Sequence, residues 1–282
     1  MLAAEQQILN TIEIQPDGDL CSGMPTGAEM LIEALVFEGV DTIFGYPGGA
    51  VLHIYDELWR ARDRITHYLV RHEQGAVHMA EGYARSTGRV GVVLVTSGPG
   101  ATNAVTGIAN AYMDSTPIVV ITGQVPKHLI GTDAFQEVDT VGITRPCVKH
   151  NYLVREAKEL PAVVREAFHL ARSGRPGPVV IDIPKDVSAA RANYSRLDHV
   201  SFPFASSNVP VHREAAKRAV NAILNSKRPV LYVGGGIANS GADESLRSFA
   251  ERLQLPVAPT LMGLGGFPSS HPLYLGMLGM HG

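Results

Sequence analysis

The stretch VGVVLVTSGPG, residues 90–100, decides the fold of this 282-residue chain. Its first six residues carry no charge and are too apolar for a strand at the edge of a sheet, so they predict a central, buried strand. The SGPG that follows is typical of a tight turn, and a helix is expected from about Ala101. A buried strand, a short turn and a helix make up the repeating unit of parallel α/β sheets.

The same alternation continues on both sides of this stretch. Thr26 and Glu29 form a capping-box pattern that opens a helix ending at Gly39. Further strands are predicted over residues 42–44, 68–70, 117–122 and 178–183, and further helices through residues 58–59, up to about residue 86, and over 160–172. The pattern predicts a three-layer α/β fold, in which a parallel sheet is covered by helices on both faces.

Composition divides the chain into four parts. Residues 1–24 lack a basic start followed by an apolar stretch, so we expect a mobile tail and not a secretory signal. The first α/β domain covers residues 25–190. Residues 191–212 are rich in Ser, Pro, Asn and Arg without periodicity, which predicts a linker.

A second α/β unit is predicted over residues 213–282. It has helices over about 214–224 and 243–253, and strands over 229–233 and at 257–258. These are too few strands for a finished domain, so we expect this domain to be incomplete.

Charge and composition exclude several classes of function. The 24 basic and 27 acidic residues give a formal net charge of −3, which favours neither nucleic acid nor an anionic membrane as a partner. No apolar run reaches the roughly 20 residues of a membrane-spanning helix. Cys21 and Cys147 suit neither a disulfide framework nor a metal site. We therefore expect a cytoplasmic protein.

Four features follow predicted strands, at the edge where parallel sheets bind ligands: Gly48-Gly49, Glu73, SGPG at 97–100, and Gly123-Gln124. The glycine turns either admit a ligand or only reverse the chain, and both interpretations stay open. Glu73 is more informative, because a carboxyl group between a buried strand and an apolar helix is partly desolvated and suited to share a proton with a bound base. A salt bridge with Arg71 is the alternative, and spacing alone does not decide between them.

Five strings occur in order: FGYPGG (44–49), RHEQGA (71–76), TSGPGATN (96–103), GTDAFQE (131–137) and SGRPGP (173–178). Together they closely resemble the large catalytic subunit of the acetolactate synthase (acetohydroxyacid synthase) family, from about Thr26 to Gly282. The HE and SGPG strings are shared by many thiamine-diphosphate decarboxylases. GTDAFQE and the closing LGMHG (278–282) are more particular to acetolactate synthases.

The resemblance implies a thiamine-diphosphate-dependent transferase. Such an enzyme condenses two pyruvates to 2-acetolactate plus CO2, or pyruvate with 2-ketobutyrate, in valine, leucine and isoleucine biosynthesis. It implies a pyrimidine-binding domain over 25–190, a Rossmann-like central FAD-binding domain from 213, and the cofactors thiamine diphosphate, Mg2+ and FAD. It also implies a homodimer with a shared active site and a small regulatory subunit. The family's third domain, which holds Mg2+ and the diphosphate, has no counterpart in these residues, so we expect this chain alone to be inactive.

The resemblance also assigns roles to residues of the first domain. Glu73 is expected to be catalytic, through a hydrogen bond to the pyrimidine N1′, and Gly48 and Gly49 to line the thiamine diphosphate pocket. Phe135 and Gln136 are expected to border the substrate channel. Without the resemblance, Phe135 would be interpreted as a core aromatic and Gln136 as a turn-stabilising amide.

Further roles are implied at Lys185 and at a set of FAD contacts. Lys185 is expected at the mouth of the substrate channel, although composition alone would make it one more solvated lysine. The expected FAD contacts are Arg175, Gly234, Gly235, Gly236, Thr260, Leu261, Met262 and His281. The glycine triplet lacks the full Gly-x-Gly-x-x-Gly spacing, so a plain tight turn is its alternative.

Two other functions stay open. The chain is either another thiamine-diphosphate carboligase or decarboxylase, or a non-catalytic short form that pairs with a full subunit through exposed apolar surface. Glyoxylate carboligase is one such rival, but that family has an apolar residue where this chain has Glu73.

Overall fold

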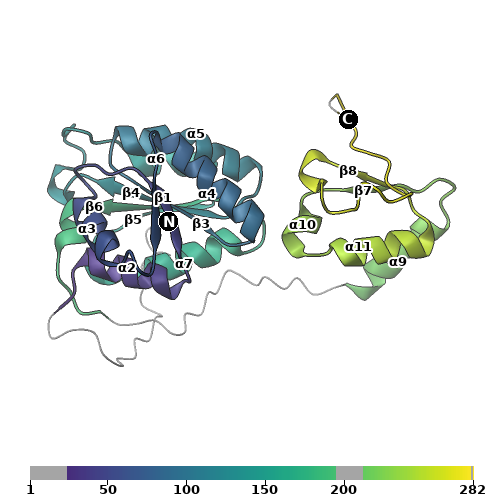
Figure 1. Cartoon of the computed structure of the whole chain (residues 1–282), viewed down its shortest axis with the longest axis horizontal. Coiled ribbons are helices and arrows are strands. Elements are labelled where there is room, and N and C mark those ends of the chain that lie inside the picture. The colour runs from purple at the N-terminus through teal and green to yellow at the C-terminus, as the bar shows by residue number, and fades with distance from the viewer. Residues whose placement is uncertain (1–23, 195–211, 281) are drawn as a thin grey trace. The chain divides into compact units, whose positions relative to one another are not determined.

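A computed structural model describes residues 24–194, 212–280 and 282. The chain forms two compact units, divided between Ser207 and Asn208, and each is described by itself (Figure 1). The predicted tail up to residue 23 and residues 195–211 of the predicted linker lie outside the described residues. The described linker residues 191–194 lie on the first unit, where the Ala192 main-chain N–H donates to the Pro25 oxygen at 3.2 Å.

The first unit is built on a six-stranded sheet in which every strand pairing is parallel. The strands are β1 (Thr42–Gly45), β2 (Thr66–Leu69), β3 (Gly91–Val95), β4 (Ile118–Gln124), β5 (His150–Leu153) and β6 (Val179–Pro184). Their order in the sheet is β2-β1-β3-β4-β6-β5. The predicted parallel sheet is therefore confirmed. Strand β5 was not predicted, because its residues are only half-buried at the sheet edge and form no apolar run.

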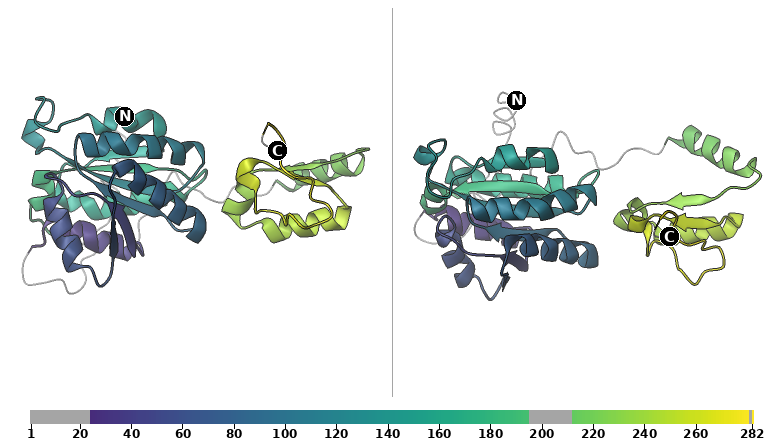
Figure 2. Two further views of the ribbon diagram at one scale, coloured as in Figure 1. Left: turned by 45° about the horizontal axis from the view of Figure 1, so that its top comes forward. Right: turned by 90° about the horizontal axis from the view of Figure 1, so that it is seen from above.

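Helices cover both faces of this sheet (Figures 1 and 2). One layer holds α4 (Glu73–Thr87), α5 (Pro99–Met113) and the short α6 (Thr140–Thr144). The other holds α2 (Gly27–Phe37), α3 (Leu52–Arg60) and α7 (Leu160–Arg172), and the short α8 (Lys185–Ala189) follows β6. Single 3-10 turns lie at Lys127–Leu129, Arg145–Cys147, Ala157–Glu159 and, in the second unit, Leu261–Gly263.

Strand β3 is buried along its whole length, as its sequence predicts. Successive side chains of a strand point to opposite faces. Accordingly, Val92 and Leu94 pack in the core beneath α2, α3 and α7, whereas Val93 and Val95 pack in the core beneath α4 and α5. The unbroken apolar run is thus required because both faces of the strand are covered.

The predicted start of α2 is also confirmed. The Thr26 hydroxyl accepts from the Glu29 main-chain N–H at 3.2 Å, and the Glu29 carboxylate accepts from the Thr26 N–H at 2.6 Å. Gly39 follows the helix end in the left-handed conformation, with φ 78°.

The second unit contains α9 (Arg213–Leu224), β7 (Leu231–Val233), α10 (Gly236–Ser240), α11 (Asp243–Leu253) and β8 (Val257–Pro259). Strands β7 and β8 pair in parallel. Its small core consists of Val233, Ala250, Val257 and Phe267. Helix α9 has no buried residue, so it contributes nothing to this core.

One carboxyl group lies inside the sheet of the first unit. Asp182 on β6 is 1% exposed and stands opposite Thr122 of β4, whose hydroxyl donates to Asp182 Oδ1 at 2.6 Å. Burial raises the pKa of Asp182 to about 7, although hydrogen bonds from Thr122 and Gln124 act to lower it.

Ionisation of Asp182 is expected to lower the stability of the first unit. Its folded pKa of about 7 lies above the ordinary value of 3.8, so the folded state binds this proton more tightly than the unfolded state. The free energy of unfolding therefore falls as the pH rises from 3.8 to about 7. Relative to Asp182→Asn, the parent chain should lose about 1–2 kcal/mol between about pH 5 and about pH 7 in urea titrations. A difference between the two proteins that stays constant with pH would contradict this.

Candidate functional site

The predicted site residues of the first unit mostly lie along the carboxyl edge of the sheet. Gly48 and Gly49 follow β1, Glu73 follows β2, and Lys185 follows β6. Strands β1 and β3 are neighbours, but the chain continues from β1 to β2 on one side and from β3 to β4 on the other. Ligands of open parallel sheets bind at such a switch point.

Glu73 is the first residue of α4, and its side chain is buried. Asn103 on α5 donates from Nδ2 to Glu73 Oε2 at 2.9 Å. Arg71 is exposed and forms no ion pair with Glu73 in the described part of the chain, so the alternative of a salt bridge between them is wrong. The buried carboxyl group is therefore held by a neutral amide, and its Oε1 faces the turn after β3, 3.6 Å from where a Cβ on Gly100 would stand.

The backbone of Gly48 closely approaches the side chain of Thr96 at the switch point. A Cβ on Gly48 would lie 2.5 Å from the Thr96 Cβ, and one on Gly100 would lie 2.8 Å from the Thr96 Cγ2. A Cβ on Gly49, in contrast, would meet nothing within 4 Å. The Thr96 Oγ1 is buried and has no hydrogen-bond partner among the described residues. The result is a cradle, formed by Gly48, Thr96 and Gly100, that presents a free hydroxyl.

Three residues of this region were missed by sequence reasoning: Asn103, Thr96 and Tyr55. Thr96 could have been found from its place directly after a buried strand, whereas nothing local marks Tyr55 on α3. Burial raises the pKa of Tyr55, and the negative charge of Glu73 adds to that effect. The Tyr55 hydroxyl lies 3.3 Å from Nε2 of His67 and 3.4 Å from the main-chain oxygen of Leu94.

Phe135 and Gln136 lie on the loop between β4 and α6. Phe135 is 88% exposed, so its interpretation as a core aromatic is wrong. The turn is braced by Glu137, whose carboxylate accepts from the main-chain N–H groups of Gly131 and Ala134. The main chain of Gln136 touches Gly98, where a Cβ would come within 2.5 Å of the Gln136 oxygen. The loop therefore packs on the turn that follows β3.

Lys185 begins α8 and is half-buried at the carboxyl edge. The fold thus places it at the same sheet edge as Glu73.

Arg175 lies at the opposite edge, shortly before β6 begins. Its Nε donates to the Ser115 hydroxyl at 2.7 Å, and its Nη2 donates to the main-chain oxygens of Tyr112 and Met113 at 3.2 and 3.0 Å. Arg175 therefore binds the end of α5 and shares no site with Glu73.

The predicted FAD contacts of the second unit come together. Gly234–Gly236 follow β7 and Thr260–Met262 follow β8, so both segments lie at the carboxyl edge of that small sheet. A Cβ on Gly235 would stand 3.1 Å from the Met262 Cβ. The Thr260 hydroxyl accepts from the Gly263 N–H at 3.1 Å. His281 lies outside the described residues.

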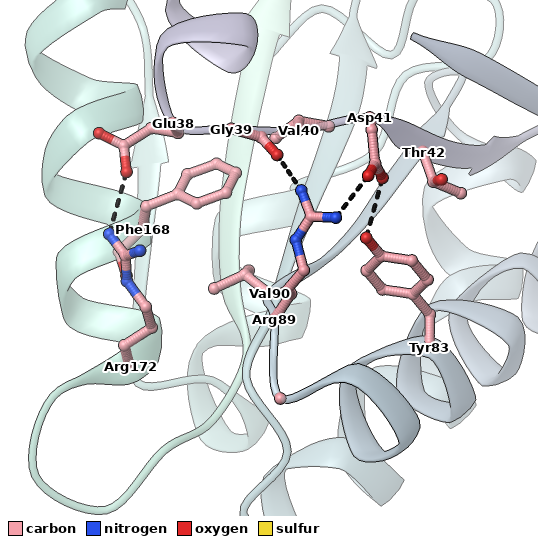
Figure 3. Close-up of a pocket in the computed structure, with 11 residues that line it drawn as sticks. Glu38, Gly39, Val40, Asp41, Thr42, Tyr83, Arg89, Val90, Phe168 and Arg172 are labelled. Carbon is pink, nitrogen blue, oxygen red and sulfur yellow. Dashed lines mark hydrogen bonds and ion pairs between the residues drawn. The ribbon is translucent and has the colours of Figure 1, made fainter.

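A cavity of about 140 Å³ lies at the amino edge of the first sheet, away from Glu73 (Figure 3). Its two arginines are paired: Arg89 with Asp41 and the Gly39 oxygen, and Arg172 with Glu38 at 2.9 Å. These charges balance one another, so the cavity offers no free charge to a ligand.

The described residues contain no group of three or more His, Cys, Asp or Glu placed to hold a metal ion. In that same part of the chain, no helix is long and apolar enough to cross a membrane.

Each of the two units contains a match to a protein family. Residues 25–143 match the thiamine pyrophosphate enzyme N-terminal TPP binding domain, and residues 216–282 match the thiamine pyrophosphate enzyme central domain.

Curated relatives and a solved structure agree with these matches. The acetolactate synthase isozyme 3 large subunit of Escherichia coli K12 is 56% identical over 261 residues, which cover 92% of this chain and 45% of the relative. The acetolactate synthase of Arthrospira platensis is 57% identical over 265 residues, covering 91% and 46%. A structure from Mycobacterium smegmatis, described as a thiamin diphosphate-dependent enzyme, has a TM-score of 0.80 at 28% identity and covers 91% of this chain and 49% of that one.

The chain spans about half the length of the curated relatives it matches. The two family matches together cover about two thirds of its residues. The chain therefore belongs to the thiamine pyrophosphate enzymes and, within them, is similar to the large subunits of acetolactate synthase.

Proposed function

We propose that this chain is the pyrimidine-binding part of an acetolactate synthase large subunit, together with the beginning of its central domain. The whole enzyme condenses two pyruvates to 2-acetolactate plus CO2, or pyruvate with 2-ketobutyrate. The observation that carries the proposal is the buried Glu73, which has no cationic partner among the described residues and faces the cradle at the switch point.

The cradle suits the flat aminopyrimidine ring of thiamine diphosphate. Gly48 and Gly100 make room for the Thr96 side chain, whereas Gly49 borders open space in which a ring could approach the backbone closely. The Thr96 hydroxyl is buried without a partner, and a polar atom of a ligand would satisfy it. Glu73 supplies a carboxyl oxygen on the same side.

Glu73 would share a proton with a ring nitrogen, a task that requires a carboxyl group and not an amide. Asn103 would keep this carboxyl group in place through Oε2 while leaving Oε1 for the ring. Thiamine diphosphate, when bound, supplies the electron sink for decarboxylation of a 2-keto acid.

The substrate would approach along the same edge. Phe135 presents an exposed ring that suits the methyl group of pyruvate, with Gln136 beside it. Lys185 adds a positive charge at this edge, which would attract the carboxylate of the keto acid.

The proposal extends to the remaining partners of such an enzyme. In the second unit, the proposed FAD contacts are the loops that follow β7 and β8, where Gly235 leaves no room for a side chain against Met262. In the first unit, Arg175 is the proposed FAD contact. We assign no Mg2+ ligand to the described residues. The enzyme would act in the cytoplasm as a homodimer with a shared active site and a small regulatory subunit.

A chimaera tests the proposed function. Residues 1–282 would replace the matching part of the Escherichia coli isozyme 3 large subunit, to which the chain is 56% identical. With thiamine diphosphate, Mg2+ and FAD, the chimaera should convert pyruvate to acetolactate. A folded chimaera that binds thiamine diphosphate but leaves pyruvate unchanged would contradict the proposal.

Glu73→Gln in the chimaera should lower kcat for acetolactate formation by about 100-fold or more, because an amide cannot share the proton. The control is Glu33→Gln on α2, which removes a carboxylate that pairs with Arg64 at the surface and should leave kcat unchanged. Equal kcat values for the two variants would be evidence against a catalytic Glu73.

Gly48→Ala and Gly49→Ala form a matched pair for the cradle. The first adds a methyl group 2.5 Å from the Thr96 Cβ and should lower the free energy of unfolding by about 1–3 kcal/mol. The second adds one in open space and should change it by less than about 0.5 kcal/mol. Urea titrations of the 282-residue chain measure both. Similar values for the two variants would show that the Gly48–Thr96 contact is not as close as described.

A further inference from the structure

Asp182 and Gln124 form a buried polar pair that the proposed function does not use. They are 1% and 2% exposed, and they lie in strands that are buried along their whole length. No Lys, Arg or His of the described residues forms an ion pair with Asp182. A buried carboxyl group without a cation destabilises a fold, so its hydrogen-bond partners are the place to look for its role.

The hydrogen bonds of this pair extend beyond the sheet. Nε2 of Gln124 donates to Asp182 Oδ2 at 3.0 Å and to the main-chain oxygen of Val138 at 2.9 Å. Its Oε1 accepts from the Val125 N–H at 2.8 Å. Oδ2 of Asp182 accepts from the amide nitrogen, and Oε1 of Gln124 accepts from Val125, so the two contacts together fix the orientation of the amide. With the amide fixed in this way, its second hydrogen points at Val138.

Val138 ends the loop of residues 131–138, which carries Phe135 and Gln136. Asp133 and Gln136 have φ values of 57° and 58°, a left-handed conformation that is unfavourable for residues other than glycine. The Glu137 carboxylate accepts from Gly131 and Ala134, and both of these hydrogen bonds lie within the loop and do not join it to the sheet. The exposed Phe135 ring contributes little packing. The bond from Gln124 to Val138 therefore ties a strained loop to the sheet.

We propose that Asp182 is a positioning residue that acts through Gln124 to hold the loop 131–138 at the carboxyl edge of the sheet, and thereby places Phe135 and Gln136. The importance of this placement for the keto acid rests on the function proposed above. The anchoring of the loop does not.

Hydrogen–deuterium exchange of the 282-residue chain tests the anchoring. Asp182→Leu keeps the shape of the side chain but removes both acceptors, and Gln124→Met keeps its length but removes both donors. Both variants should speed exchange of the amides of residues 131–138 about fivefold to tenfold, the loss of about one hydrogen bond. Exchange in β3 reports whether the sheet itself remains folded.

Two controls separate anchoring from general destabilisation. Thr122→Val removes the other hydrogen bond to Asp182 and leaves Gln124 untouched, so exchange of the loop should stay within about twofold of the parent. Asp182→Asn should also preserve the loop, because its Oδ1 can accept from Gln124 while its amide donates to the Thr122 hydroxyl.

Three results would overturn the inference: unchanged loop exchange in folded Asp182→Leu and Gln124→Met, equal loosening in Thr122→Val, or equal loosening in Asp182→Asn. The outcome is independent of the proposed function. A loosened loop in a chain whose chimaera makes no acetolactate would refute the synthase while the anchoring stands. An active chimaera with an unchanged loop would refute the anchoring alone.

Discussion

The parallel direction of all six strands is the constraint on which the first unit depends. Parallel strands bring every strand-to-helix turn to one edge of the sheet, so Gly48, Glu73, Thr96 and Lys185 share an edge although they are far apart in sequence. The same arrangement requires helices on both faces, and it is the reason why the central strands must be apolar along their whole length. One architectural rule thus fixes both the core and the position of the site.

Much of the fold could be predicted because its signals are local. The apolar run of β3, the capping box at Thr26 and the helices Leu160–Arg172 and Asp243–Leu253 can be recognised from short stretches of sequence, and the structure contains them. Strand β5 lacked such a signal, since a half-buried edge strand tolerates polar residues. The five-residue helices α6, α8 and α10 are too short to show a helical period.

The candidate site was predictable only in part. The place of Glu73 after a strand and before a helix was enough to expect its burial, but its partner Asn103 lies on another helix and is brought there by tertiary packing. The Thr96 hydroxyl, which has no partner among the described residues, is buried because its side chain packs against the backbones of Gly48 and Gly100, and no local pattern predicts this packing. Phe135 shows the opposite case: a large aromatic residue suggests a core position, yet the braced turn holds it in solvent.

The buried carboxyl groups of the first unit differ in whether a cation pairs with them. Glu81, two turns beyond Glu73 on the same helix, is paired with Arg85 at 2.5 Å and with Asn110 on α5, so its charge is compensated and it joins α4 to α5. Glu73 and Asp182 are also buried, but their partners are neutral: the Asn103 amide for Glu73, and the Gln124 amide and the Thr122 hydroxyl for Asp182. Stability alone favours the arrangement at Glu81, because an uncompensated buried carboxyl group is unfavourable. The two carboxyl groups without a cation both lie toward the carboxyl edge, where the cradle and the loop 131–138 converge, and this is the part of the sheet at which ligand binding would offset their unfavourable burial.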